Sequence, residues 1–241
     1  MSLLSTILTF CLNLLCPPLC PICRKEVDTP HCLCPNCFGQ LRFITQPYCK
    51  ICGRPFEYNA FGDLICGSCM EKSPCYDMAR SVLIYDDFSK QLVLAFKHGD
   101  HTELAPLFGK FLMSADPDLF QETDIIAAVP LHRLRMVKRK YNQAGLLCRK
   151  VSRHTGIPYH PNLLKRVKAT KSQGHLSHQK RQENLKNAFQ ITHATKVSGK
   201  TVLLIDDVMT TGTTVSECAK ALKKAGAKSV KVLTLYRAIS F

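Results

Sequence analysis

Between residues 76 and 241, short apolar runs alternate with segments in which apolar residues recur every three or four positions. The short runs predict buried strands at 81–85, 124–129, 201–205 and 229–235. The periodic segments predict helices at 90–98, 103–113, 141–155 and 213–225, and Gly156 and Gly226 follow the last two as stop signals. Strands that alternate with helices are typical of α/β proteins, so we predict a mostly parallel sheet with helices on both faces.

The pattern changes near Ser73-Pro74-Cys75, because the chain before this point is rich in Cys, Pro and Gly and shows little periodicity. We therefore expect a cysteine-rich module at 1–75 and an α/β domain at 76–241. Residues 1–15 are apolar, but they lack both a preceding Lys or Arg and a small-x-small cleavage site, so we expect a buried or capping helix rather than a secretory signal. No run of 18 apolar residues occurs, and no membrane-spanning segment is expected.

The 241 residues include 46% hydrophobic ones, a globular composition that excludes a disordered chain. Of fourteen cysteines, twelve lie between Cys11 and Cys75. A secreted disulfide scaffold would spread its cysteines through the whole core and would carry a signal peptide. The clustering in C-x-x-C pairs instead favours metal binding in a reducing compartment, and we expect a cytoplasmic protein.

Four C-x-x-C pairs occur within fifty residues, and each can supply two thiolates to one tetrahedral metal ion. Their cysteines are Cys20, Cys23, Cys34, Cys37, Cys49, Cys52, Cys66 and Cys69. The spacing predicts two structural zinc ions, with the pairs combined either sequentially or in a cross-braced order. Cys32 is an alternative to Cys34, although it breaks the C-x-x-C spacing with Cys37. Zinc removal is expected to unfold this module and to spare much of 76–241.

The positive charge is concentrated in one segment. Lys plus Arg is 33 and Asp plus Glu is 18, which gives a formal net charge of +15. Residues 132–186 contain fifteen basic residues and a single acid, Glu183, and therefore contribute +14. A solvated surface would mix both signs, so this segment favours phosphate, either in a nucleic acid or in a phosphorylated small molecule.

A second motif occupies residues 202–214, which read V-L-L-I-D-D-V-M-T-T-G-T-T. A buried strand is followed by Asp206 and Asp207, whose carboxylates can accept hydrogen bonds from sugar hydroxyls. Thr210, Thr211, Gly212, Thr213 and Thr214 then form a turn at a helix N-terminus, where anions are favoured. Together these groups suit a ribose 5-phosphate. The turn lacks the Lys of a Walker loop, the glycines of a Rossmann fingerprint are missing, and a receiver domain would place its acids nearer its start.

The chain resembles the ComF/GntX family of competence-associated proteins from Cys20 onward, and residues 202–214 are similar to the phosphoribosyl pyrophosphate (PRPP) motif of type I phosphoribosyltransferases. The matching segments are L-C-P-x-C from Leu19, C-x-x-C-G-R-P at 49–55, L-x-x-x-F-K-H-G-D at 92–100, V-P-L-H-x-x-R at 129–135, Y-N-Q-A at 141–144 and R-x-x-N-L-x-x-A-F at 181–189. The resemblance implies a phosphoribosyltransferase-like domain behind a double zinc module. It also implies a role in handling incoming single-stranded DNA during natural transformation, together with the DNA-uptake machinery.

The resemblance also implies roles for particular residues. Asp206 and Asp207 would act as the catalytic acids that engage the ribose hydroxyls, with Mg²⁺ bridging ribose and pyrophosphate. Residues 210–214 would bind the 5-phosphate, and Arg133 and Arg135 would contact pyrophosphate after the strand at 124–129. The family has Gly before the aromatic residue of Y-N-Q-A, whereas this chain has Lys140. Residues 166–181 are interpreted as a basic flap over the ligand.

Three functions fit these residues. The first is a phosphoribosyltransferase that uses PRPP and Mg²⁺ with an unidentified nitrogen acceptor. The second is a PRPP- or nucleotide-sensing module without catalysis, since no residue is a clear general base. The third is a single-stranded DNA binder, for which residues 132–186 offer only Tyr141 and Tyr159 as stacking side chains. The residues favour the phosphoribosyl ligand, and the resemblance adds the DNA.

Overall fold

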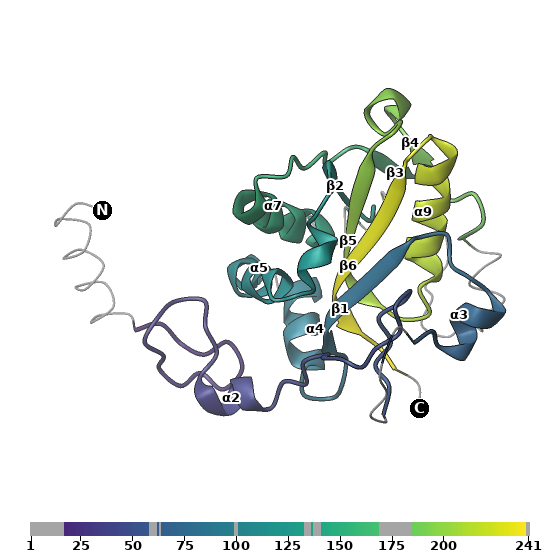
Figure 1. Ribbon diagram of the computed structural model, residues 1–241. Coiled ribbons are helices and arrows are strands. Elements are labelled where there is room, and N and C mark those ends of the chain that lie inside the picture. The colour runs from purple at the N-terminus through teal and green to yellow at the C-terminus, as the bar shows by residue number, and fades with distance from the viewer. Residues whose placement is uncertain are drawn as a thin grey trace.

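The computed structural model describes residues 17–57, 62, 64–98, 101–132, 136, 141–168 and 185–239 (Figure 1). The helix expected at 1–15 lies outside the described residues. Within the described ranges, no helix combines the length and the hydropathy that are needed to cross a membrane.

A four-stranded parallel sheet forms the centre of the molecule. Its strands are β1 (Met78–Ile84), β2 (Ile125–Ala128), β5 (Thr201–Met209) and β6 (Ser229–Arg237). Their order is β1-β6-β5-β2, so β5 and β6 occupy the central positions. Because parallel strands end at the same side of a sheet, the segments that follow β2 and β5 meet at the edge where open α/β sheets bind ligands.

Helices cover both faces of this sheet (Figure 1). One face carries α4 (Lys90–His98), α5 (Ala105–Met113) and α7 (Gln143–Thr155). The other carries α9 (Thr213–Lys224) and an antiparallel pair, β3 (Leu164–Arg166) with β4 (Phe189–Ile191). The described residues also include the short 3-10 helices η1 (Thr102–Leu104), η2 (Pro117–Leu119) and η3 (Ala194–Lys196). The fold class predicted from the sequence is confirmed.

The central strand β5 shows how one apolar run serves two cores. Leu203 and Ile205 pack into the cluster that contains α4, α5 and α7, while Val202 and Leu204 pack into the cluster that contains α9. All four side chains are fully buried. A strand buried on both faces needs a continuous apolar run rather than an alternating one, which is the pattern at 201–205.

Strand β1 begins at Met78, three residues before the predicted start, and its buried polar residues have hydrogen-bond partners. Ser81 and Thr234 are both buried, and their hydroxyl oxygens lie 2.6 Å apart. Arg80 is 7% exposed and its Nε donates to Asp116 Oδ2 at 2.9 Å. A buried polar residue that has such a partner is compatible with a strand interior, but the apolar pattern alone does not reveal it.

Strands β5 and β6 both extend beyond their predicted ends, to Met209 and Arg237. The two strands remain paired past Ile205, from Asp206 opposite Thr234 to Met209 opposite Arg237. The change from apolar to acidic residues at 206 therefore marks a decrease in burial and not the end of the strand.

The cysteine-rich segment contains α2 (Pro35–Gly39) and α3 (Gly67–Glu71) and runs along the outer edge of β1. The Ile44 backbone N–H donates to the Val82 carbonyl oxygen at 2.8 Å, and the Ile84 N–H donates to the Arg42 oxygen at 2.9 Å. These bonds satisfy backbone groups that an edge strand would otherwise leave open.

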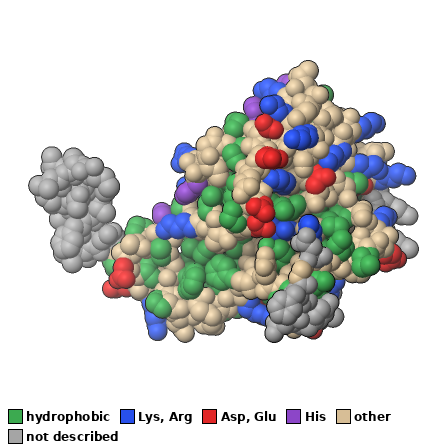
Figure 2. Space-filling model, viewed as in Figure 1, with side chains coloured by type: hydrophobic (Ala, Val, Ile, Leu, Met, Phe, Trp, Pro, Cys, Tyr) green, Lys and Arg blue, Asp and Glu red, His purple; other side chains and the backbone are tan. Residues whose placement is uncertain are grey.

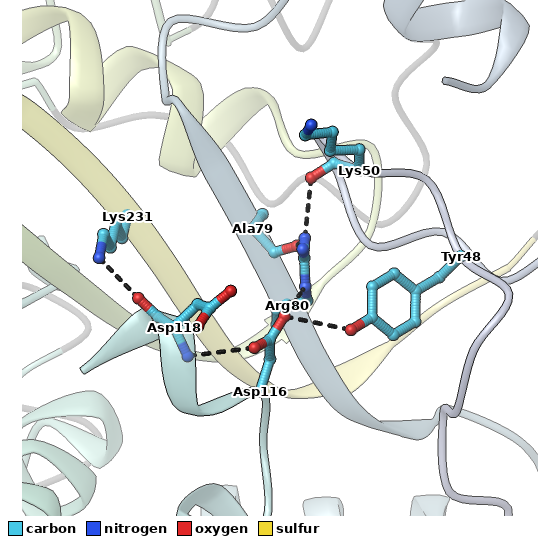
Figure 3. A network of polar contacts seen from close by, with 7 residues as sticks. All are labelled: Tyr48, Lys50, Ala79, Arg80, Asp116, Asp118 and Lys231. Atoms are coloured by element: carbon cyan, nitrogen blue, oxygen red, sulfur yellow. Dashed lines mark hydrogen bonds and ion pairs between the residues drawn. The ribbon is translucent and has the colours of Figure 1, made fainter. Parts of the chain in front are cut away.

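A polar network fixes the second half of the cysteine-rich segment to the sheet (Figure 3). Asp116 accepts from Arg80 Nε at 2.9 Å and from the Tyr48 hydroxyl at 3.1 Å, and Arg80 Nη1 donates to the Lys50 carbonyl oxygen at 2.9 Å. Burial alone would raise the pKa of Asp116, but the Asp118 backbone N–H and the Arg80 guanidinium outweigh it and lower that pKa. This network joins residues on both sides of the domain boundary expected at 75. That boundary stays a prediction.

Candidate functional site

The first cysteine cluster contains Cys20, Cys23, Cys34 and Cys37, whose sulfur atoms all lie within 4.8 Å of one another. The Sγ atoms of Cys23 and Cys34 are 3.5 Å apart. Cys34 immediately precedes α2 and Cys37 lies within it, so this short helix forms the second knuckle. Three of the thiols are buried and Cys23 is exposed.

The second cluster contains Cys49, Cys52, Cys66 and Cys69, all of them buried and all with sulfur atoms within 4.8 Å of one another. It contacts the end of β6. Arg237 Nη1 donates to the Cys52 carbonyl oxygen at 3.1 Å, and its Nη2 lies 3.7 Å from Cys52 Sγ. Burial raises the pKa of the Cys52 thiol to about 11 although the Arg237 charge opposes this change.

In each cluster, backbone N–H groups lower the pKa of one thiol and so favour its thiolate form. Burial alone would raise the pKa of Cys20, but the N–H groups of the two knuckles outweigh it and lower the pKa to about 6. Cys49 behaves in the same way, and its pKa falls to about 7 because the N–H groups of Cys52 and Cys66 point at its sulfur from 3.5 and 3.4 Å. The thiolate is the form that binds metal, so one sulfur atom in each cluster favours that form, whereas burial raises the pKa of Cys37, Cys52 and Cys69.

The two clusters fit structural zinc. A tetrahedral ion with Zn–S bonds of about 2.3 Å places its sulfur ligands roughly 3.8 Å apart, within the spread seen here. The structure combines the C-x-x-C pairs sequentially, which resolves the choice that the sequence left between sequential and cross-braced pairing. Cys34 rather than Cys32 completes the first cluster. Each site has four cysteines and so is closed, as a structural role requires.

Asp206 and Asp207 lie in the last part of β5, where the strand becomes half-buried. The Asp207 backbone N–H donates to Asp206 Oδ1 at 2.9 Å. Lys97, in the last turn of α4, places its Nζ 3.2 Å from Asp207 Oδ2. This lysine offsets the negative charge of Asp207 in a partly desolvated position.

The turn after β5 depends on Gly212. This residue is the N-cap of α9 and has a φ of +75°, a left-handed conformation that favours glycine. A Cβ at this position would lie 2.8 Å from Met209 Cε and 3.4 Å from the Tyr76 hydroxyl oxygen. The glycine is therefore needed for the backbone conformation, and any larger residue would also have to shift the end of the Met209 side chain.

The threonines of the turn surround the N-terminus of α9. Thr210 and Thr211 are exposed, whereas Thr213 and Thr214 form the first residues of the helix. The Thr211 and Thr213 hydroxyl oxygens lie 2.8 Å apart. The first backbone N–H groups of a helix have no partner within it, so this turn can bind an anion beside the acid pair.

Comparison with known proteins agrees with this arrangement. Residues 11–70 match the double zinc ribbon domain, and residues 147–240 match the phosphoribosyl transferase domain. The chain is 34% identical over 226 residues to competence protein F of Haemophilus influenzae, an alignment that covers 91% of this chain and 96% of that protein. The chain belongs to the ComF family.

Another relative of this ComF-family protein is DNA utilization protein YhgH of Salmonella typhimurium, which is 34% identical over 229 residues, or 92% of this chain and 98% of that protein. Among solved structures, glutamine PRPP amidotransferase from B. subtilis complexed with ADP and GMP has a TM-score of 0.40 and 18% identity, over 58% of this chain and 30% of that chain. The matched transferase domain, together with the parallel sheet, confirms the type I phosphoribosyltransferase-like fold.

The structure places most, but not all, of the residues that the sequence predicted for the site of this ComF-family protein. All eight predicted zinc ligands form the two clusters, and the acid pair is continuous with the turn at 210–214. Arg133 and Arg135 lie outside the described residues, as do 137–140 and most of the basic flap expected at 166–181. Their assignment to pyrophosphate stays a prediction.

The sequence analysis did not predict Lys97, whose Nζ lies 3.2 Å from Asp207 Oδ2. Its signal was present, since both L-x-x-x-F-K-H-G-D and Y-N-Q-A match the family. The structure connects these two motifs: Gln143 Nε2 donates to the Lys97 carbonyl oxygen at 3.3 Å, and the Tyr141 hydroxyl donates to the Phe96 carbonyl oxygen at 2.9 Å. Neither motif shows in sequence that it lies near the acids, which are more than sixty residues further along the chain.

Proposed function

We propose that this ComF-family protein binds PRPP, or a related ribose 5-phosphate, together with Mg²⁺ at the carboxyl edge of β5. One observation carries the proposal: an acid pair at the end of the central strand continues directly into a glycine turn at the N-terminus of a 12-residue helix. Carboxylates accept hydrogen bonds from the 2- and 3-hydroxyls of ribose, and the helix N-terminus suits the 5-phosphate. Mg²⁺ binds through one or two carboxylates and through substrate phosphates, which fits this donor set.

We propose further that the bound ligand undergoes phosphoribosyl transfer. The bond between C1 of ribose and the pyrophosphate oxygen would break, a bond from C1 to a nitrogen of the acceptor would form, and the displaced proton of that nitrogen would pass to solvent. The acid pair would stabilise the positive charge that develops on the ribose, and Arg133 and Arg135 would hold the leaving pyrophosphate. Release of pyrophosphate with an acceptor distinguishes this enzyme from a sensor that only binds PRPP.

Replacing Asp206 and Asp207 together by Asn is expected to leave the protein folded and to weaken Mg²⁺-dependent PRPP binding by at least about tenfold, or 1.4 kcal/mol. Asn keeps the size of the side chain but removes two negative charges that attract Mg²⁺ and accept from hydroxyls. Isothermal titration with PRPP, with and without Mg²⁺, measures the change.

The matched control removes two charges from the opposite edge of the same sheet. Asp77 and Asp124 precede β1 and β2 and form ion pairs with Lys223 at 2.7 Å and Lys200 at 3.4 Å. Replacing both of them by Asn is expected to leave PRPP binding unchanged. Full PRPP binding by the Asp206→Asn/Asp207→Asn variant would show that the acid pair is structural.

We also propose a role in DNA handling, on the strength of the relatives named for competence and DNA utilization. The basic segment at 132–186 is the candidate contact for a single-stranded backbone, because the rest of the chain contains eighteen Lys and Arg residues against seventeen Asp and Glu residues. Figure 2 shows both signs of charge together on one face of the molecule. We place both activities in the cytoplasm, where a reducing environment preserves zinc-binding thiolates.

Charge reversal of the Lys-Arg-Lys run at 138–140 tests this second role. If the run contacts the DNA backbone, replacing all three residues by Glu is expected to weaken binding of single-stranded oligonucleotides of any sequence. It should also reduce the slope of log affinity against log salt by about 2, since single strands lose roughly 0.7 per neutralised phosphate. Fluorescence anisotropy at several salt concentrations measures both.

Reversal at Lys220, Lys224 and Lys228 provides the control, because these exposed lysines change the net charge by the same amount. An equal loss of affinity in both variants would indicate a general effect of charge. Unchanged DNA binding after reversal at 138–140 would show that this run does not contact DNA, and only a role toward the phosphoribosyl ligand would then stay proposed for it.

A further inference from the structure

The ion pair between Lys97 and Asp207 places a cation where the proposed ligand must act. Lys97 Nζ lies 3.2 Å from Asp207 Oδ2, and the side chains are 20% and 14% exposed. An ion pair in this partly buried position is screened less than one on the open surface. Asp207 therefore has a cationic partner in the ligand-free protein, and a ligand that uses its carboxylate must compete with that partner.

The backbone that carries Lys97 is held by the start of α7. Gln143 is 1% exposed, and its Nε2 donates to the carbonyl oxygens of Lys97 at 3.3 Å and Phe96 at 3.5 Å. The Tyr141 hydroxyl donates to the same Phe96 oxygen at 2.9 Å. The last carbonyl groups of a helix lack partners within it, so these side chains cap α4 and fix the point from which the Lys97 side chain extends.

We propose that Lys97 is an exchangeable cation of the phosphoribosyl site, an inference that rests on the proposed function. In the ligand-free protein its ammonium group neutralises Asp207. When the Mg²⁺-bound ligand engages the acid pair, the ammonium group leaves Asp207 and pairs with the phosphate oxygens of the ligand. Lys97 thereby disfavours free divalent cations at the acid pair and favours cations that arrive with a phosphorylated sugar.

Charge balance supports this exchange. A divalent cation at Asp207 would repel an ammonium group about 3 Å from the same carboxylate, which opposes binding of the metal alone. A ligand that brings several negative charges with the metal gives the lysine a new partner at the same site. The lysine side chain suits such a shift because it is a compact charge on a flexible four-carbon chain, and its anchored backbone limits the movement to the side chain.

The test compares the metal alone with the metal and ligand together. Lys97→Met removes the charge and keeps most of the apolar chain. Mn²⁺ alone, followed by electron paramagnetic resonance, is expected to bind at least about threefold tighter to this variant, because its competitor is gone. PRPP in the presence of Mg²⁺ is expected to bind about tenfold more weakly by isothermal titration. A purely structural role would not produce changes of opposite sign.

Two further variants complete the design. Lys90→Met removes an exposed lysine from the other end of α4 and should change neither affinity. Lys97→Arg keeps the charge and should still exclude Mn²⁺, which guards against a folding defect in the Met variant. If the wild-type protein binds PRPP and Lys97→Met binds both Mn²⁺ and PRPP as wild type does, the exchange is wrong while the proposed function stands. If the wild type shows no Mg²⁺-dependent PRPP binding, the proposed function fails and the exchange fails with it.

Discussion

Replacing Cys69 by Ser is expected to reduce the zinc content from two ions per chain to one and to lower the unfolding temperature of the whole sheet by about 10 °C, which corresponds to roughly 4 kcal/mol. The second cluster belongs to the same buried core as Ala79 of β1 and Met209 of β5. The Ala79 backbone N–H also donates to the Ile51 carbonyl oxygen at 2.7 Å. Metal loss at this site should therefore loosen the sheet, and not only the cysteine-rich segment as the sequence suggests.

Cys37→Ser is the matched control, because Cys37 is the fourth cysteine of the first cluster and is equally buried. That cluster packs mainly in a small core of its own with Ile22, Val27, Leu33 and Phe88. We expect this variant to lose one zinc ion as well, with a clearly smaller fall in the unfolding temperature. Zinc analysis and hydrogen exchange of the β1 and β6 amides measure the two effects, and equal protection in both variants would contradict the expected coupling.

Replacing Gly212 by Val is expected to lower PRPP affinity about a hundredfold, or roughly 2.8 kcal/mol, while the protein still folds. A branched side chain strains the left-handed backbone and must displace Met209 Cε, which a Cβ would approach to 2.8 Å. This added atom points into the packing beneath the turn. The expected loss therefore comes from displacement of the N–H groups of the turn, rather than from a block in the path of the phosphate. Isothermal titration with PRPP measures it.

Gly156→Val separates backbone strain from the effect on the site. Gly156 ends α7 with a φ of +74°, close to the +75° of Gly212, and a Cβ there meets no atom within 4 Å. Both variants should lose a similar free energy of unfolding from strain, about 1–2 kcal/mol. Only the Gly212 variant should lose ligand stabilisation in a thermal shift assay. If Gly212→Val keeps that stabilisation, the turn does not bind the ligand.

Local spacing explains what the sequence could predict. The C-x-x-C pairs, the acid pair and the glycine turn are each formed by residues close together in the chain, so their chemistry is visible before the fold is known. The start of strand β5 and both ends of helix α9 are likewise predicted to within one residue, because a continuous apolar run and a helix stop are strong signals.

Contacts between distant segments explain what the sequence could not predict. Arg237 reaches Cys52 across 185 residues, and no local pattern distinguishes it from an ordinary strand residue. Lys97 meets Asp207 only because α4 and β5 contribute to the same hydrophobic core on one face of the sheet. The pair of β3 and β4 has three residues in each strand, too short for an alternating pattern to be recognised.

The cover on the outer edge of β1 has a consequence for the order of folding. Strand β1 contacts β6 on its inner side, and Ser81 meets Thr234 across 153 residues of chain. During synthesis β1 therefore has no inner neighbour until those 153 residues have been made, and contacts at such separation form slowly. Residues 42–44 precede β1 and are made first, so they can pair with it as it emerges. Such pairing would leave β1 less open to association with other chains before β6 is available.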